Sequence, residues 1–278
     1  EGQHLTTIAH AEGEGVPPRR GRRSPEQPLK LPAFIFAFII LQGMFGMWTV
    51  TLKLWPQVVT AHLLGGFTTI SLLWLLTLRL NNQRWQLPAI AESKLLALRP
   101  LVVLGLLIVV GQIALGGWTT SNYADIACPD FPRCQGAWLP PMDFANGFNI
   151  TQHVGPNYLG GKLDSTARTA IHLTHRIGAL LVTFSLLTLA WQLRREGLKG
   201  LAGLLVLALG VQIGLGISNV VFHLPLWVAI AHNAGGAALM LTLTLINYRV
   251  RPVYAPSRRH APSFWQHAHV LLHLGPHR

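Results

Sequence analysis

The segments VVTAHLLGG (58–66) and VAIAHNAGG (228–236) each place a histidine shortly before a pair of glycines, inside a strongly apolar run. A histidine is costly to bury in hydrocarbon and usually has a function when it is found there. The repetition of this pattern raises two questions: which fold buries these runs, and what the histidines bind.

Composition indicates the class of protein. Half of the 278 residues are hydrophobic and only 12% are charged, a balance typical of a polytopic membrane protein and not of a soluble domain. The net charge of +12 does not indicate a nucleic-acid-binding protein, because Lys and Arg lie in short segments between the apolar runs. With only two cysteines, the chain cannot be a disulfide-rich scaffold.

Six runs are long enough for a helix that crosses the hydrocarbon core of a bilayer, which takes roughly 20 residues. Helices are expected because an isolated span must satisfy its own backbone hydrogen bonds. We therefore predict an all-α, polytopic membrane bundle of six transmembrane helices, at residues 32–50, 57–78, 100–118, 167–193, 199–221 and 224–247.

The positions of the basic residues predict the orientation of this bundle. Lys and Arg concentrate before the first run and after the second, fourth and sixth runs, so every second connection is basic. We therefore predict an integral protein, of a bacterial inner membrane, with both termini cytoplasmic and the loop 119–166 outside. The predicted parts are a disordered polar leader (1–30), two helices (31–78), a cytoplasmic connection (79–99), a four-helix half (100–247) and a cytoplasmic tail (248–278).

An internal repeat relates the two quoted segments. Residues 41–66 align without gaps on residues 211–236, and nine of the 26 positions are identical, including one Gln, one His and three Gly. The first two helices are thus a repeat of the last two. Because no apolar run precedes residue 31, we expect one complete four-helix half and a second half that lacks its first two helices.

The histidines of the apolar runs are candidate ligands. His175, in IHLTHRIGA (171–179), and His232 lie in helices that run in the same direction, each about eight residues from the outer end and therefore about 12 Å below the outer surface. Two imidazoles at the same depth in a helical bundle are predicted to bind one haem iron from both faces. Arg176 is expected to pair with a haem propionate.

The alternative for each of these side chains is a hydrogen bond to a neighbouring helix, without a cofactor. His172 lies three residues before His175 on nearly the same face, and His62 is the equivalent of His232 in the repeat, which makes both secondary candidates for cofactor binding. The amides within the apolar runs, which we expect to form interhelical hydrogen bonds, are Gln42, Gln112 and Gln212.

The loop 119–166 contains Cys128 and Cys134, six residues apart. An oxidising exterior permits a disulfide bond between them, and two free thiols are the alternative. A metal site is disfavoured, because no further pair of cysteines or histidines accompanies them.

These segments together resemble the haem A synthase family of bacteria and mitochondria. The resemblance covers roughly residues 31–247 and is carried by LQGMFGMWTVTLKLWPQVVTAHL (41–63), DIACPDFPRCQGAWLP (125–140), IHLTHRIGA (171–179) and LPLWVAIAHNAGGA (224–237). It implies eight transmembrane helices in two similar halves. It also implies oxidation of the C8 methyl group of haem O to a formyl group, which yields haem A for terminal oxidases.

The resemblance further implies roles for single residues. A b-type haem would be bound by His175 and His232, and the substrate haem O by the half that carries His62. The family adds a Glu-x-x-His-Arg segment beside the substrate, and this sequence has none. The catalytic residues are therefore not identified, and we expect weak or no turnover from this chain alone.

The sequence thus predicts a membrane oxidoreductase of haem A biosynthesis, with haem b as cofactor, haem O as substrate and iron as the bound metal. A non-enzymatic b-haem-binding protein, serving electron transfer or oxidase assembly, is the alternative. Besides the lipid bilayer, the expected partners are a haem O synthase or oxidase assembly factors; a homo-oligomer is compatible with the sequence, and no nucleic acid is expected. A transporter is disfavoured, because the apolar runs contain no Asp or Glu.

Overall fold

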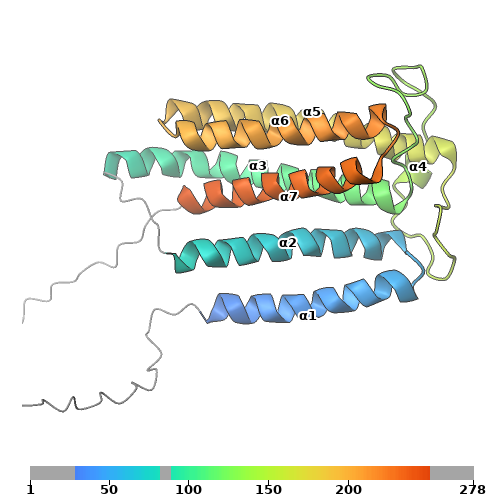
Figure 1. Cartoon of the computed structure of the whole chain (residues 1–278), viewed down its shortest axis with the longest axis horizontal. Coiled ribbons are helices and arrows are strands. Elements are labelled where there is room, and N and C mark those ends of the chain that lie inside the picture. The colour runs from blue at the N-terminus through green and yellow to red at the C-terminus, as the bar shows by residue number, and fades with distance from the viewer. Residues whose placement is uncertain (1–28, 82–88, 251–278) are drawn as a thin grey trace, which may run out of the picture.

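The computed structural model describes residues 29–81 and 89–250, and gives only the backbone of residues 89–93. Within these ranges the chain forms six long helices and one short helix (Figure 1). The six long helices are long and apolar enough to cross a membrane, which confirms the predicted all-α bundle. The helices are α1 (Lys30–Thr51), α2 (Pro56–Leu80), α3 (Ala89–Ser121), α4 (Phe144–Gly147), α5 (Ser165–Arg195), α6 (Lys199–Val221) and α7 (Leu226–Arg249).

The predicted runs agree with the six long helices except at the start of α3. This helix begins at Ala89, inside the segment 79–99 that was predicted as a connection, and continues through Pro100. The residues before Pro100 are mostly Ala, Leu, Glu, Lys and Arg, all of which favour helix. The charged residues among them interrupt the apolar run, so the helix extends beyond that run. The predicted leader and tail lie almost entirely outside the described residues.

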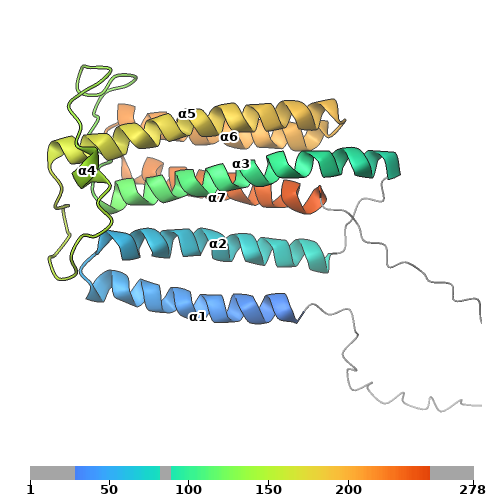
Figure 2. The ribbon, with the colours of Figure 1, turned by 180° about the vertical axis from the view of Figure 1, so that it is seen from behind.

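Helices α3, α5, α6 and α7 form a closed four-helix bundle. In this bundle α3 packs against α5, α5 against α6, α6 against α7, and α7 against α3. Helix α2 packs on α3 and α7, while α1 contacts α2 alone among the described elements. Figures 1 and 2 show α1 at the edge of the stack, and Ile35 is its one buried residue.

The packed core of the bundle lies toward one end. Its buried side chains come from residues 95–109 of α3, 182–193 of α5, 202–209 of α6 and 239–250 in and after α7. All four ranges lie away from the segment 122–164, which joins α3 to α5 at the other end (Figure 1). Because lipid tails are as apolar as leucine, close packing holds such a core together more than removal from water does.

The segment 122–164 folds over one end of the bundle, called here the loop end. It is anchored to α3 where the Trp118 indole N–H donates to the Gly147 carbonyl at 2.8 Å. Three further hydrogen bonds join it to the turn between α1 and α2 and to the start of α2, so it fastens this hairpin to the bundle. They are Trp55 Nε1 to Gln152 O, Gln57 Nε2 to Ile150 O and Tyr158 N to Lys53 O, each 3.0 Å.

Cys128 and Cys134 form a disulfide bond, as predicted, and close what we call the disulfide loop (128–134). Asp130 caps this loop, because its carboxylate accepts the backbone N–H groups of Gln135 and Gly136 at 2.6 and 2.8 Å. These bonds, the one from Gly136 foremost, hold the pKa of Asp130 below its ordinary value.

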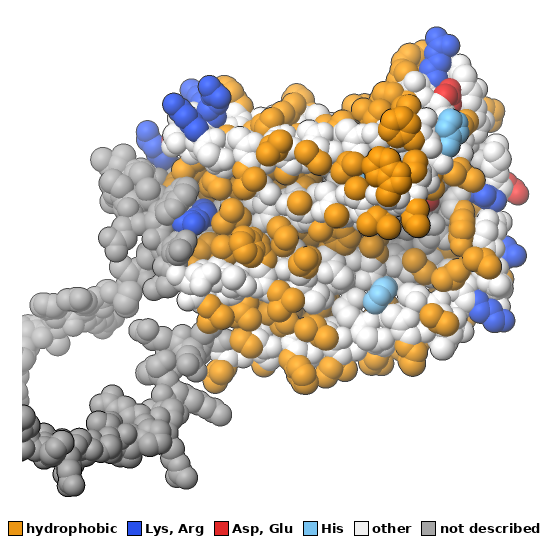
Figure 3. All heavy atoms as spheres, in the orientation of Figure 1, with side chains coloured by type: hydrophobic (Ala, Val, Ile, Leu, Met, Phe, Trp, Pro, Cys, Tyr) orange, Lys and Arg blue, Asp and Glu red, His pale blue; other side chains and the backbone are white. Residues whose placement is uncertain are grey.

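The two ends of the bundle differ in charge, and the apolar surface of the spans lies between them (Figure 3). At the loop end, five described basic residues face four aspartates: Lys53, Arg133, Lys162, Arg168 and Arg176, with Asp125, Asp130, Asp143 and Asp164. The opposite end, called here the basic end, carries Lys30, Arg79, Lys94, Arg99, Arg194, Arg195, Lys199 and Arg249 together with Glu196.

The internal repeat is visible in the backbone, where it has a third copy. Helices α1, α3 and α6 end in the same turn, with a residue of positive φ at the same place in each. In each turn the next residue's N–H donates to a carbonyl five residues earlier: Leu54 to Thr49 (2.8 Å), Ala124 to Thr119 (2.9 Å) and Leu224 to Asn219 (2.7 Å). Each helical hairpin, α1–α2, α3–α5 and α6–α7, is therefore a variant of one unit.

Candidate functional site

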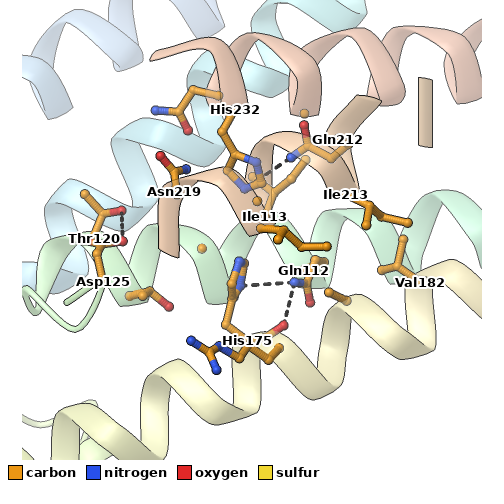
Figure 4. A pocket seen from close by; sticks show the side chains of 18 of the residues that line it. Gln112, Ile113, Thr120, Asp125, His175, Val182, Gln212, Ile213, Asn219 and His232 are labelled. Carbon is orange, nitrogen blue, oxygen red and sulfur yellow. Dashed lines mark hydrogen bonds between the residues drawn. The ribbon is translucent and has the colours of Figure 1, made fainter. Parts of the chain in front are cut away.

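A cavity of about 280 Å³ lies between α2, α3, α5, α6 and α7, on the loop side of the packed core. His175 of α5 and His232 of α7 both line it. Figure 4 shows the two imidazole rings pointing into the same space from different helices. The structure thus brings together the two side chains that the sequence selected as a ligand pair.

His175 is held by an amide from α3. Gln112 Nε2 lies 3.1 Å from Nδ1 of His175 and donates to the backbone carbonyl of the same residue at 2.9 Å. On the other side of the ring is Gly116, where an added Cβ would lie only 3.2 Å from Cε1 of His175. The ring therefore lies between an amide and a glycine.

His232 is held in a similar way by α6. Gln212 Nε2 lies 3.4 Å from Nε2 of His232, and an added Cβ on Gly216 would lie 3.1 Å from its Cε1. Nδ1 of His232 is buried without a hydrogen-bond partner in the protein. Since buried polar atoms are nearly always paired, this nitrogen indicates a partner other than the protein.

The donor set fits a haem iron better than a bare metal ion. Among the described residues, no group of three or more His, Cys, Asp or Glu side chains is arranged to hold a metal ion. A bare Zn²⁺ needs at least three protein ligands, whereas a haem iron needs only one or two from the protein. The unpaired Nδ1 of His232 and the glycines beside both rings agree with a ligand that enters between the two histidines.

His172 lines the same cavity, but its ring already has a partner. Its Nδ1–H donates to the carbonyl of Ala124 at 2.8 Å, and the residue is buried. This bond ties α5 to the turn after α3 and fixes the orientation of the His172 ring.

Arg176 lines the cavity and also holds the disulfide loop. Its guanidinium donates to the carbonyls of Cys128, Asp130 and Arg133 at 3.0, 2.9 and 2.8 Å, and lies 5.8 Å from the ring centroid of Phe131. Its Nε is buried without a partner. The sequence predicted a haem propionate as its partner, and most of its donors are instead used within the protein.

His62 lies outside this cavity, in a neighbouring hollow. That hollow is lined by His62, Gly66, Ile70 and Ala237, and it shares the walls Leu63, Phe67 and Asn233 with the main cavity. Nδ1 of His62 is buried without a partner. The structure therefore places His62 beside the His175–His232 pair and not within it.

Asp125 is a cavity-lining residue that the sequence did not single out. Its carboxylate accepts a hydrogen bond from Thr120 Oγ1 at 3.2 Å. Burial raises the pKa of Asp125 above its ordinary value, and the bond from Thr120 opposes that shift. In the sequence, Asp125 directly follows the third copy of the repeated turn, and this position is the signal that could have identified it. That copy is hard to see because the segment 122–164 separates its two helices.

Comparison with known proteins places the chain in one family. The chain matches the model of the COX15-CtaA family, described as cytochrome oxidase assembly protein, over residues 9–244. It is 48% identical over 227 residues to the heme A synthase of Shewanella oneidensis, covering 81% of this chain and 68% of that protein. It is 27% identical to the Arabidopsis thaliana heme A synthase COX15, over 58% of this chain and 33% of that protein. It is 31% identical to the heme A synthase of Methylobacterium radiotolerans, over 55% of this chain and 40% of that protein.

Proposed function

The chain belongs to the COX15-CtaA family of cytochrome oxidase assembly proteins, an oxidoreductase family, and on that premise we propose that it converts haem O to haem A. The reaction oxidises the C8 methyl group of haem O to a formyl group; with water as the source of the oxygen atom, four electrons pass to an external acceptor and four protons to solvent. The observation that carries the proposal is the cavity inside a membrane-spanning bundle, lined by His175 and His232. The protein contacts proposed with this role are delivery of haem O from a haem O synthase and transfer of haem A to oxidase assembly factors.

His175 and His232 are proposed to bind a b-type haem. When bound between these two histidines, such a haem would supply one-electron transfer. Gly116 and Gly216 let each ring lie close to the facing helix. Arg176 Nε is the donor still available to a propionate.

The substrate haem O is proposed to bind in the hollow beside α2, with His62 as its protein ligand. The buried, unpaired Nδ1 of His62 supports this assignment. Leu63, Phe67 and Asn233 are walls of both the hollow and the main cavity, so only side chains separate the two proposed haem sites. An electron leaving the substrate would therefore have a short path to the haem cavity.

One observation favours a second candidate, a non-enzymatic haem protein for electron transfer or oxidase assembly. Oxidation of a methyl group benefits from a base near the substrate, and the residues that line the His62 hollow include no carboxylate. The two functions predict the same haem spectrum and differ in whether haem A is formed.

The haem site is tested by absorbance spectra of the purified chain. We expect the wild type to show a low-spin b-type haem, and His175→Ala and His232→Ala each to lose that spectrum. His223→Ala is the matched control, because His223 is an exposed histidine at the loop end and should leave the spectrum unchanged. Wild-type spectra in both cavity variants would refute the ligand assignment.

The reaction is tested by extracting haems from cells that make haem O and express this chain. Formation of haem A supports the enzyme, and a low-spin spectrum without haem A supports the non-enzymatic candidate. His62→Ala should abolish haem A formation while the b-type spectrum is kept. Normal conversion by this variant would refute the proposed substrate site.

A further inference from the structure

The disulfide loop contributes a side chain to the wall of the cavity. Phe131 lines the cavity together with His172, His175 and Arg176. The other lining residues belong to α2, α3, α5, α6 and α7 or to the turns that follow α3 and α6. Among the described residues that line the cavity, Phe131 is therefore the one that the disulfide loop supplies.

Phe131 lies at the mouth of the cavity. Its side chain is 49% exposed, and a side chain that lines a cavity while half exposed lies at the boundary between the cavity and the outside. The Arg176 guanidinium is 5.8 Å from the centroid of its ring, within the range of a cation–π contact. The ring is thus oriented by a neighbour and still has apolar surface left for a ligand.

The loop is fastened to the helix that carries His175. Arg176 donates to three carbonyls of the loop, as described above. Gln135, directly after the loop, donates through Nε2 to Thr169 Oγ1 of α5 at 2.9 Å. Thr169 and Arg176 are seven residues apart, which is about two turns along one face of the helix. The position of Phe131 is therefore fixed relative to α5 and its histidine.

We propose that the disulfide loop is a lid on the haem cavity and that Phe131 is the residue through which the lid retains the haem. The inference rests on the proposed function, because it requires a haem between His175 and His232. A porphyrin is a flat and largely apolar ring system, so an aromatic side chain at the mouth of its cavity gains contact that a departing haem must give up. Because the loop is already held in place, little freedom is lost on binding, and the contact slows dissociation.

The test follows the transfer of haem from the haemin-loaded full chain, in detergent, to an excess of apomyoglobin. Phe131→Ala should raise the transfer rate about tenfold, because it removes the aromatic contact. The low-spin spectrum of the loaded chain and the thermal unfolding midpoint of the haem-free chain should stay unchanged, because both iron ligands and the packed core remain. Phe131→Trp restores an aromatic ring and should bring the rate back close to that of the wild type.

Phe144→Ala is the matched control. Phe144 is also a half-exposed phenylalanine of the segment 122–164, with 53% of its side chain exposed. Its ring likewise has a neighbour, Phe148, at a centroid distance of 6.4 Å. It lines neither the cavity nor the His62 hollow, so its substitution should leave the transfer rate unchanged.

A second comparison tests whether the loop acts as a unit. The double variant Cys128→Ser, Cys134→Ser opens the base of the loop and should also raise the transfer rate. Adding Phe131→Ala to this double variant should then cause little further increase, because the ring is no longer held over the cavity. A full tenfold increase on top of the double variant would contradict the lid.

Faster transfer from Phe131→Ala than from the wild type and from Phe144→Ala supports the proposal. Equal rates for the wild type and Phe131→Ala, or equal acceleration by Phe131→Ala and Phe144→Ala, overturn it. A low-spin b-type spectrum of the wild type in the same preparation would then leave the proposed function standing. A wild-type chain that binds no haem would overturn both.

Discussion

Asp125 places an ionisable group at the loop side of the cavity, where burial disfavours its charged form and raises its pKa above the ordinary value of 3.8. The folded chain therefore holds this proton more tightly than the unfolded chain does. The contribution of Asp125 to stability is fully present below the ordinary pKa and is lost as the pH rises through the raised value.

Asp125→Asn should remove this part of the pH dependence, because the amide has no proton to lose. From about pH 4 to about pH 7, near the ordinary Asp range and above it, the thermal unfolding midpoint of the wild type in detergent should fall relative to that of the variant. Asp143→Asn is the control of opposite sign, because the Asn146 N–H lowers the pKa of Asp143 and its stabilisation is lost as the pH falls. Parallel profiles for wild type and Asp125→Asn would contradict the assignment.

Arg176 illustrates why residue type alone does not identify a partner. A guanidinium carries five donors and suits a propionate as well as a set of carbonyls. In the fold, three carbonyls of the disulfide loop lie within reach of it, so this cation fixes the loop beside the cavity.

Helices α3 and α5 lie close together where Gly178 faces the amide of Gln112. A substitution at Gly178 tests how much this close approach matters. Gly178→Ala should lower the free energy of unfolding by about 1–3 kcal/mol, because the new Cβ overlaps Gln112 Oε1. It should also displace the amide from His175 and alter the haem spectrum. The measurement is chemical unfolding in detergent beside the absorbance spectrum.

Gly111→Ala is the control for this substitution. Gly111 lies next to Gln112 in α3, and an added Cβ there meets nothing within 4 Å. Alanine favours helix over glycine by up to about 1 kcal/mol, so the control should be neutral or stabilising. Equal effects of the two substitutions would show that the glycine contact with the amide is unimportant.

Across the bundle, the uneven distribution of charge sets the expected orientation in the membrane. The basic end has a large excess of Lys and Arg among the described residues, while the basic residues of the loop end are nearly matched by aspartates (Figure 3). The positive-inside rule then predicts that the basic end lies in the cytoplasm, and the disulfide bond at the loop end agrees with an oxidising exterior.

Cysteine labelling tests this orientation. A membrane-impermeant maleimide should label Val154→Cys, at the loop end, in intact spheroplasts, and should label Glu196→Cys, at the basic end, only after lysis. Both positions are exposed. The two native cysteines are joined in a disulfide, so the maleimide does not label them. The reverse pattern would invert the topology.

The sequence by itself determined the spans, the disulfide pair and the repeat of α1–α2 in α6–α7. Each of these depends on residues close together in the chain: a span on a run long enough to cross hydrocarbon, the disulfide on two nearby cysteines, and the repeat on two helices joined by a short turn. The start of α3 at Ala89 was missed because helix propensity continues where apolarity stops.

Only the tertiary structure decided what these elements form together. It decided the third copy of the repeated turn, the partners of the ring nitrogens, the use of Arg176 in the disulfide loop and the place of Asp125 beside the cavity. Each of these brings together segments that the loop 122–164 or whole helices separate in the chain. Such contacts depend on how helices rotate and pack against one another. Packing of this kind is set by close contacts across the bundle, which no local stretch of sequence encodes.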